Sequence, residues 1–241
     1  MNIVKTTFFH TKRPGWTWNL FFLVFFIFVL CLDSCISGTS DKGTTKVAVP
    51  KSPDTINKDI IDTLVVGLLP FDDFDAALLR YEKKEIESFY SVKCIILPMH
   101  NLPESAYNNR KRYIADSLLD YLESIRPDTV HYIVGLTAED ISTRKGNYAD
   151  WGIFGLGYMP GNACVISTYR LSDESISQTL LSDRLTKTVL HELGHNFGLD
   201  HCSTVGCLME ADDYGDKIDT EGKWFCKKCQ VELKGLYRHG D

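Results

Sequence analysis

The stretch that decides the fold begins at residue 191, where the chain reads HELGHNFGLDH through residue 201. Residues four apart on a helix share one face, so His191 and His195 can bind the same metal ion. Glu192 directly follows the first histidine, where its carboxylate can serve as a general base. We therefore expect one helix to carry two metal ligands and the base that works beside them.

A glycine and a third histidine complete the motif. Gly198 allows the chain to leave the helix through a backbone conformation that other residues resist, and the turn brings His201 back as a third imidazole. Three nitrogen ligands with one open position are typical of a catalytic zinc site, whereas structural sites are closed. The H-E-x-x-H core alone occurs on many helices by chance, but the full spacing makes chance improbable. The motif predicts a catalytic zinc that activates a water molecule, with Glu192 as general base.

Four cysteines follow the histidines in two pairs, and they are Cys202, Cys207, Cys226 and Cys229. Two close cysteine pairs separated by a loop are typical of a closed, structural four-thiolate zinc site. Because Cys202 directly follows His201, folding of this group should help to hold the third histidine in place. In an exported protein the same four cysteines could instead form two disulfides, since oxidation competes with zinc for thiolates.

Together these residues give the pattern H-E-x-x-H-x-x-G-x-x-H-C-x4-C-x-M-x16-C-x-x-C over residues 191–229. It resembles the signature of the archaemetzincins, a metzincin-like family of zinc metallopeptidases, with a last spacer that is one residue shorter. The resemblance implies two zinc ions per chain, a catalytic zinc on the three histidines and a structural zinc on the four cysteines. It also implies that Met209 lies in a Met-turn beneath the catalytic metal, which is compatible with a buried core methionine.

The resemblance further implies an α/β fold, in which helices, including the H-E-x-x-H helix, pack on a mixed, mostly parallel sheet. A C-terminal four-cysteine zinc subdomain completes it. Apolar runs and helical periodicity upstream agree, because they predict strands and helices in the order β-α-β-α-β, which favours a parallel sheet. The expected strands are 59–69, 92–97 and 129–136, and the expected helices run from residue 72 or 73 to 90 and over 112–125.

Two further short strands are expected at 152–158 and 163–168, followed by an active-site helix that begins near residues 181–183 with Ser182 as its cap. In metzincin-like folds an edge strand at this place takes substrate as an added strand, and glycines would let another backbone approach. An ordinary hairpin that finishes the sheet is the alternative.

Several residues have open assignments. Cys94 and Cys164 lie in apolar strands and are expected to be buried free thiols, with a disulfide as the alternative if those strands adjoin. Tyr158 and Tyr214 are equal candidates for an oxyanion donor. Asp200 is either a group that orients His201 or a surface turn residue.

The N-terminus has the features of an export signal. Basic residues precede an apolar run at 16–32, and residues 32–35, LDSC, resemble a bacterial lipobox with Cys35 as the lipidated residue. We expect a lipoprotein-type signal peptide at 1–34, a flexible tether at 35–58 and the peptidase domain at 59–241. An uncleaved signal anchor and ordinary secretion remain open as alternatives.

The 241 residues carry a net charge of −6 and no basic stripe, so we expect no nucleic-acid partner. The leading hypothesis is a monomeric zinc endopeptidase or aminopeptidase, exported and anchored to the membrane of a bacterial cell envelope, that acts on peptides or proteins. The alternatives are a non-catalytic, zinc-dependent peptide-binding lipoprotein, and a structural lipoprotein whose late cysteines form disulfides.

Overall fold

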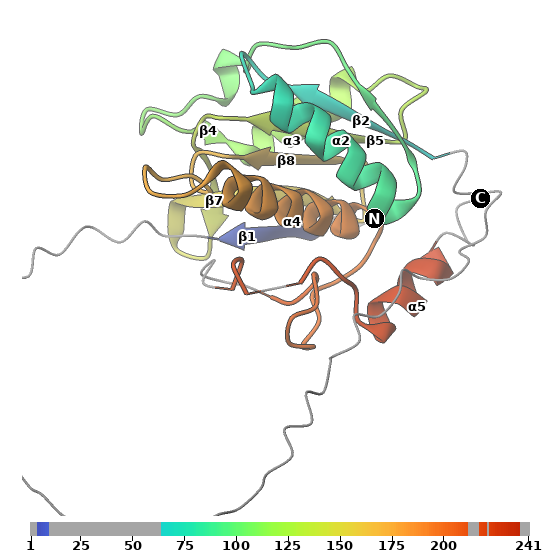
Figure 1. Cartoon of the computed structure of the whole chain (residues 1–241). Coiled ribbons are helices and arrows are strands. Elements are labelled where there is room, and N and C mark those ends of the chain that lie inside the picture. Colours follow the sequence, from blue (N-terminus) through green and yellow to red (C-terminus); the bar gives the residue numbers. More distant parts are fainter. Residues whose placement is uncertain (1–3, 10–63, 212–216, 221, 237–241) are drawn as a thin grey trace, which may run out of the picture. The chain divides into compact units, whose positions relative to one another are not determined.

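The computed structural model describes residues 4–9, 64–211, 217–220 and 222–236. In this part of the chain, one eight-stranded mixed sheet carries helices on both faces (Figure 1). The strands are β1 Val4–Phe9, β2 Val65–Pro70, β3 Lys93–Ile96, β4 Tyr113–Ile114, β5 Tyr132–Thr137, β6 Ile141–Lys145, β7 Tyr148–Met159 and β8 Ala163–Ser167. The helices are α2 Ala76–Tyr90, α3 Ala115–Ile125, α4 Gln178–Asn196 and α5 Lys227–Leu236, with a 3₁₀ turn, η1, at Glu104–Ala106.

The sheet has the order β3-β2-β5-β8-β7-β6-β4, and β1 pairs with β7. Strands β3, β2, β5 and β8 run parallel to one another, which confirms the predicted parallel arrangement. Strand β7 runs antiparallel to β8, β6 and β1. The result is the mixed, mostly parallel α/β fold that the sequence predicted.

The central strands are apolar at nearly every position because both faces of the sheet are covered. Val66 and Val134 pack on the face that α2 and α4 cover. Leu69 and Ile133 pack on the opposite face, which α3 covers. The buried residues described in both core clusters lie between residues 66 and 233.

Several predicted boundaries were wrong because a better cap lay nearby. Helix α4 begins at Gln178, since the hydroxyl of Ser177 accepts a hydrogen bond from the Leu180 backbone N–H at 3.1 Å. The predicted cap, Ser182, lies inside the helix and donates to the Gln178 carbonyl. Helix α2 begins at Ala76 with Asp75 as its cap, and not at residue 72 or 73 as predicted.

Strand β6 is missing from the sequence-based prediction, and the strand expected at 152–158 is the second half of β7. Strand β6, with the sequence ISTRK, is largely polar, so no apolar run marked it. The alternative disulfide between Cys94 and Cys164 was also wrong, because β2 and β5 separate the two strands and both thiols are free.

The predicted lipidation residue, Cys35, and the tether lie outside the described residues. So does the apolar run at 16–32. Among the residues that are described, no helix is long and apolar enough to cross a membrane.

Candidate metal centre

Three histidines meet at the C-terminal end of α4. The Nε2 atom of His195 lies 2.9 Å from Nε2 of His191 and 3.3 Å from Nε2 of His201. His191 and His195 are buried one helical turn apart, and His201 is partly exposed beyond the helix end. The structure therefore brings together all three residues that the motif predicted.

Backbone carbonyls determine which nitrogen of each helical histidine carries the proton. Nδ1 of His191 lies 2.6 Å from the Leu208 carbonyl oxygen, and Nδ1 of His195 lies 2.7 Å from that of Leu199. A carbonyl oxygen only accepts, so each Nδ1 must donate. Burial, helped by His201, lowers the pKa of His195 to about 3, and burial, helped by His195 and His201, lowers that of His191 well below its usual range. Both rings are thus neutral, with Nε2 as an acceptor.

This donor set fits a metal ion. Two neutral acceptor nitrogens only 2.9 Å apart repel each other unless a cation lies between them. Zinc–nitrogen bonds of about 2.0–2.1 Å in a tetrahedral site place neighbouring ligand nitrogens roughly 3.3 Å apart. The observed separations of 2.9 and 3.3 Å lie close to that value.

The chain conformation after α4 explains how the third histidine reaches the other two. Helix α4 ends at Asn196 with Phe197 as its C-cap, and Gly198 then has a φ of 94°, a left-handed value that turns the chain away from the helix. Asp200 then accepts a hydrogen bond from the His201 backbone N–H at 2.7 Å. The exposed Asp200 carboxylate therefore stabilises the turn, in agreement with its interpretation as a turn residue.

Glu192 lies on the sheet side of the histidines, against the second half of β7. A Cβ atom added to Gly155 would be 2.9 Å from Cγ of Glu192, and one added to Gly157 would be 3.2 Å from its Oε2. Glu192 itself is buried. The two glycines therefore provide the space that the carboxylate occupies, which the sequence analysis attributed only to the approach of another backbone.

Met209 packs directly beneath the helix between the two histidines. Its side chain is fully buried, and its Sδ atom would be 2.7 Å from a Cβ added to Gly194. The glycine in the H-E-x-x-H motif therefore makes room for this methionine. The position agrees with a Met-turn and with a core role for Met209.

Two residues that the sequence analysis did not select hold α4 in place. Asn196 donates from Nδ2 to the carbonyls of Tyr158 and Ala163, both at 2.9 Å, and so joins the helix end to β7 and β8. Tyr90 of α2 donates its hydroxyl proton to the Leu190 carbonyl at 2.5 Å. A buried polar residue at a helix end is a weak sequence signal, because asparagine is also common in exposed turns.

The four late cysteines form a second cluster, in which all four Sγ atoms lie within 4.8 Å of one another. The Cys226–Cys229 and Cys207–Cys229 sulfur distances are 3.6 and 3.9 Å. Disulfide sulfurs are only about 2.05 Å apart, whereas tetrahedral zinc–sulfur bonds of about 2.3 Å give roughly 3.8 Å between sulfurs. All four thiols are free, so the structure favours a thiolate metal site over the disulfide alternative.

The protein matches the model of Peptidase family M54 over residues 71–235. An archaemetzincin of Haloquadratum walsbyi is 30% identical over 174 residues, which are 69% of this chain and 97% of that protein. The chain belongs to the archaemetzincins. The crystal structure of Archaemetzincin from Methanopyrus kandleri has a TM-score of 0.64 at 29% identity, and the match covers 73% of this chain and 96% of that one.

This archaemetzincin is therefore a zinc metallopeptidase with the fold of its family.

Tyr158 does not serve as an oxyanion donor, since its side chain packs on the α3 face and its hydroxyl donates to Asp120. Tyr214, the other candidate, lies outside the described residues.

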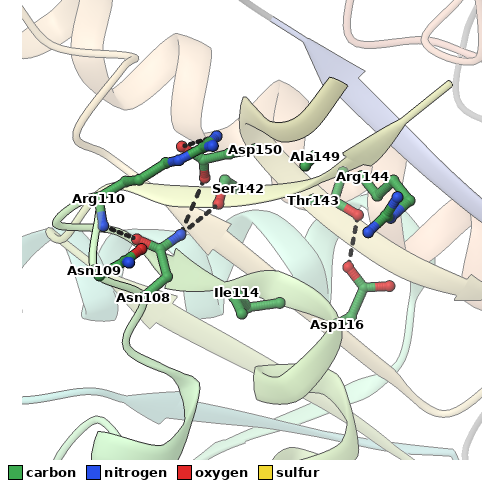
Figure 2. Close-up of a pocket in the computed structure, with 10 residues that line it drawn as sticks. All are labelled: Asn108, Asn109, Arg110, Ile114, Asp116, Ser142, Thr143, Arg144, Ala149 and Asp150. Carbon is green, nitrogen blue, oxygen red and sulfur yellow. Dashed lines mark hydrogen bonds and ion pairs between the residues drawn. The ribbon is translucent and has the colours of Figure 1, made fainter. Parts of the chain in front are cut away.

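A cavity of about 490 Å³ lies between the loop before β4, the start of α3 and the β6–β7 hairpin (Figure 2). Neither the three histidines nor the four cysteines line it, so it belongs to neither cluster. Asn108 donates to Asp150 at 3.0 Å, and Thr143 donates to Asp116 at 2.6 Å. Arg112 forms a 2.9 Å ion pair with Asp150. These bonds hold the hairpin that leads into the glycines beside Glu192.

Proposed function

We propose that this archaemetzincin hydrolyses peptide bonds with a catalytic zinc bound by His191, His195 and His201, and with Glu192 as general base. The observation that carries the proposal is the convergence of the Nε2 atoms, 2.9 and 3.3 Å apart, while carbonyls hold the Nδ1 protons. When bound, zinc supplies Lewis acidity, which polarises a carbonyl group and makes water a stronger nucleophile.

The role of Glu192 follows from its position. It lies next to His191 in sequence, and its buried carboxylate points toward the glycines of β7. From there Glu192 takes a proton from the attacking water and delivers it to the leaving amine. Burial keeps bulk solvent away from the carboxylate, so the proton stays on this path.

Replacing the base without changing the ligands tests this role. Glu192→Gln keeps the size of the side chain and removes its ability to accept a proton. We expect unchanged zinc content and a fall in kcat/KM of at least about 10²-fold. Unchanged cleavage of a peptide library by the variant would remove Glu192 from the mechanism. Peptide binding by the wild-type zinc form without any turnover would instead favour the non-catalytic peptide-binding alternative.

We further propose a second, structural zinc bound by Cys202, Cys207, Cys226 and Cys229. The sulfur separations of 3.6 and 3.9 Å support it. Burial opposes ionisation, but hydrogen bonds from the Cys229 backbone and the Thr204 hydroxyl lower the pKa of Cys226 to about 6. Burial raises the pKa of Cys207 to about 12 and also raises that of Cys229, so the proposal rests on the sulfur geometry. Elemental analysis of residues 59–241 should find two zinc ions per chain. A single zinc together with no titratable thiols in this group would refute the proposal.

For the cellular location, we propose an exported monomer that is anchored to the membrane through a lipid on Cys35. Support comes from the sequence, which has an apolar run at 16–32 followed by LDSC. Metabolic labelling with a radioactive fatty acid should mark the wild type but not Cys35→Ser. Equal labelling of both proteins would exclude Cys35 as the lipidated residue.

A further inference from the structure

Among the described strands, β1 is the one that pairs with the outer edge of the second half of β7. Strand β6 pairs with β7 from Tyr148 to Ile153 and then leaves it. From Ile153 to Met159 the same strand pairs antiparallel with β1, while β8 pairs with its opposite edge. The segment Val4–Phe9 therefore acts as an added strand on an edge that the other described strands leave unpaired beyond Ile153.

The register brings β1 past the proposed general base. Thr6 pairs with Gly157 and Phe8 pairs with Gly155, which are the two glycines that border the Glu192 carboxylate. Strand β1 also lies against α4, the helix that carries Glu192 (Figure 1). A substrate peptide that pairs with β7 beside this carboxylate would have to bind the same edge of β7 that β1 occupies.

We propose that Val4–Phe9 occupies the substrate-binding edge of β7, so that the unprocessed chain is inhibited by its own N-terminal segment. This inference rests on the proposed peptidase function. The buried residues described in both core clusters lie between residues 66 and 233, so loss of the N-terminal segment would open the edge and leave all of them in the chain. If the expected signal peptide at 1–34 is cleaved, its removal also activates the enzyme.

Hydrogen exchange tests the occupancy separately from catalysis. The full chain and residues 59–241 are compared in the same detergent, both with Glu192→Gln so that turnover cannot alter the sample. We expect the β7 amides at 153–159 to exchange at least about tenfold faster in the truncated protein, because their partner strand is gone. Equal exchange in both proteins would overturn the proposal.

Proline substitutions provide a matched pair. Neighbouring residues of a strand point their N–H groups to opposite edges, so only one of Thr6→Pro and Thr7→Pro removes a bond to β7. We expect one variant to raise both exchange at 153–159 and peptidase turnover of the full chain, and the other to change them much less. Identical behaviour of the two variants would argue against strand pairing.

Adding the segment back completes the test. The peptide VKTTFF, residues 4–9, should inhibit the catalytically competent truncated protein and restore protection at 153–159. Protection without measurable turnover in any form would refute the proposed peptidase function but not the occupancy. Turnover that is equal in the full and truncated chains, and that the peptide does not inhibit, would refute the inhibition.

Discussion

Replacing Gly155 by alanine should displace Glu192 without touching a metal ligand. The added Cβ would lie 2.9 Å from Cγ of Glu192, 3.1 Å from its Oε1 and 3.2 Å from Cγ2 of Thr188. Carbon atoms in contact are normally about 3.5–4.0 Å apart, so the glutamate must move by roughly 0.6–1 Å. Because Glu192 is buried, the side chain has little room to move while keeping its direction.

A misplacement of about 1 Å in a catalytic group can cost about 10²-fold in rate. We therefore expect Gly155→Ala to reduce kcat/KM by about that factor, with unchanged zinc content measured by elemental analysis. Peptide cleavage is assayed at a temperature well below the unfolding midpoint, so that lost stability does not lower the rate.

Gly67→Ala is the matched control. Its added Cβ would lie 2.8 Å from Cδ1 of Leu97, a similar steric conflict on β2 that does not involve Glu192. Overpacking of this kind costs about 1–3 kcal/mol of stability, and we expect it to leave kcat/KM unchanged. If Gly155→Ala retains wild-type kcat/KM, or if Gly67→Ala loses as much, the positioning of Glu192 by β7 is refuted.

Three further predictions concern stability and the metal. Burial raises the pKa of Glu82 to about 8, so the folded state binds a proton that the unfolded state loses between about pH 4.5 and 8, and stability falls over that range. In urea unfolding, Glu82→Gln should therefore gain stability over the wild type as the pH rises from 5 to 8, and a constant difference would contradict this. The pKa of His195 is lowered to about 3, so below about pH 6.5 the unfolded state binds more protons than the folded state. After zinc removal with a chelator, the wild-type domain should therefore lose stability as the pH falls from 6.5 towards 3. The His195→Gln variant should lose less stability over the same range. Cys226→Ser should release one zinc and, by loosening the turn at His201, lower kcat/KM. Full activity with one zinc would show that the cysteine cluster does not support the histidine site.

Local sequence spacing was sufficient to predict the metal-binding residues and the core strands. The i, i+4 histidines share a helix face by helix geometry, and Gly198 adopts the left-handed φ that its place in the motif predicted. The apolar runs of β2 and β5 were recognisable because both of their faces are buried. The start of α4 was not recognisable in the same way, because Ser177 and Ser182 offer equivalent hydroxyls and only packing selects between them.

The sequence by itself determined which residues can bind metal, because ligand type and helical spacing are properties of a short segment. Only the tertiary structure decided how these residues are oriented and covered. The Leu208 carbonyl sets the tautomer of His191, Gly155 and Gly157 set the place of Glu192, and β7 is the strand with which the N-terminal segment pairs. The physical reason is that these partners are backbone groups and glycines distant in sequence from the residues they contact. Their positions therefore depend on how the helices and strands pack, and not on residue type alone.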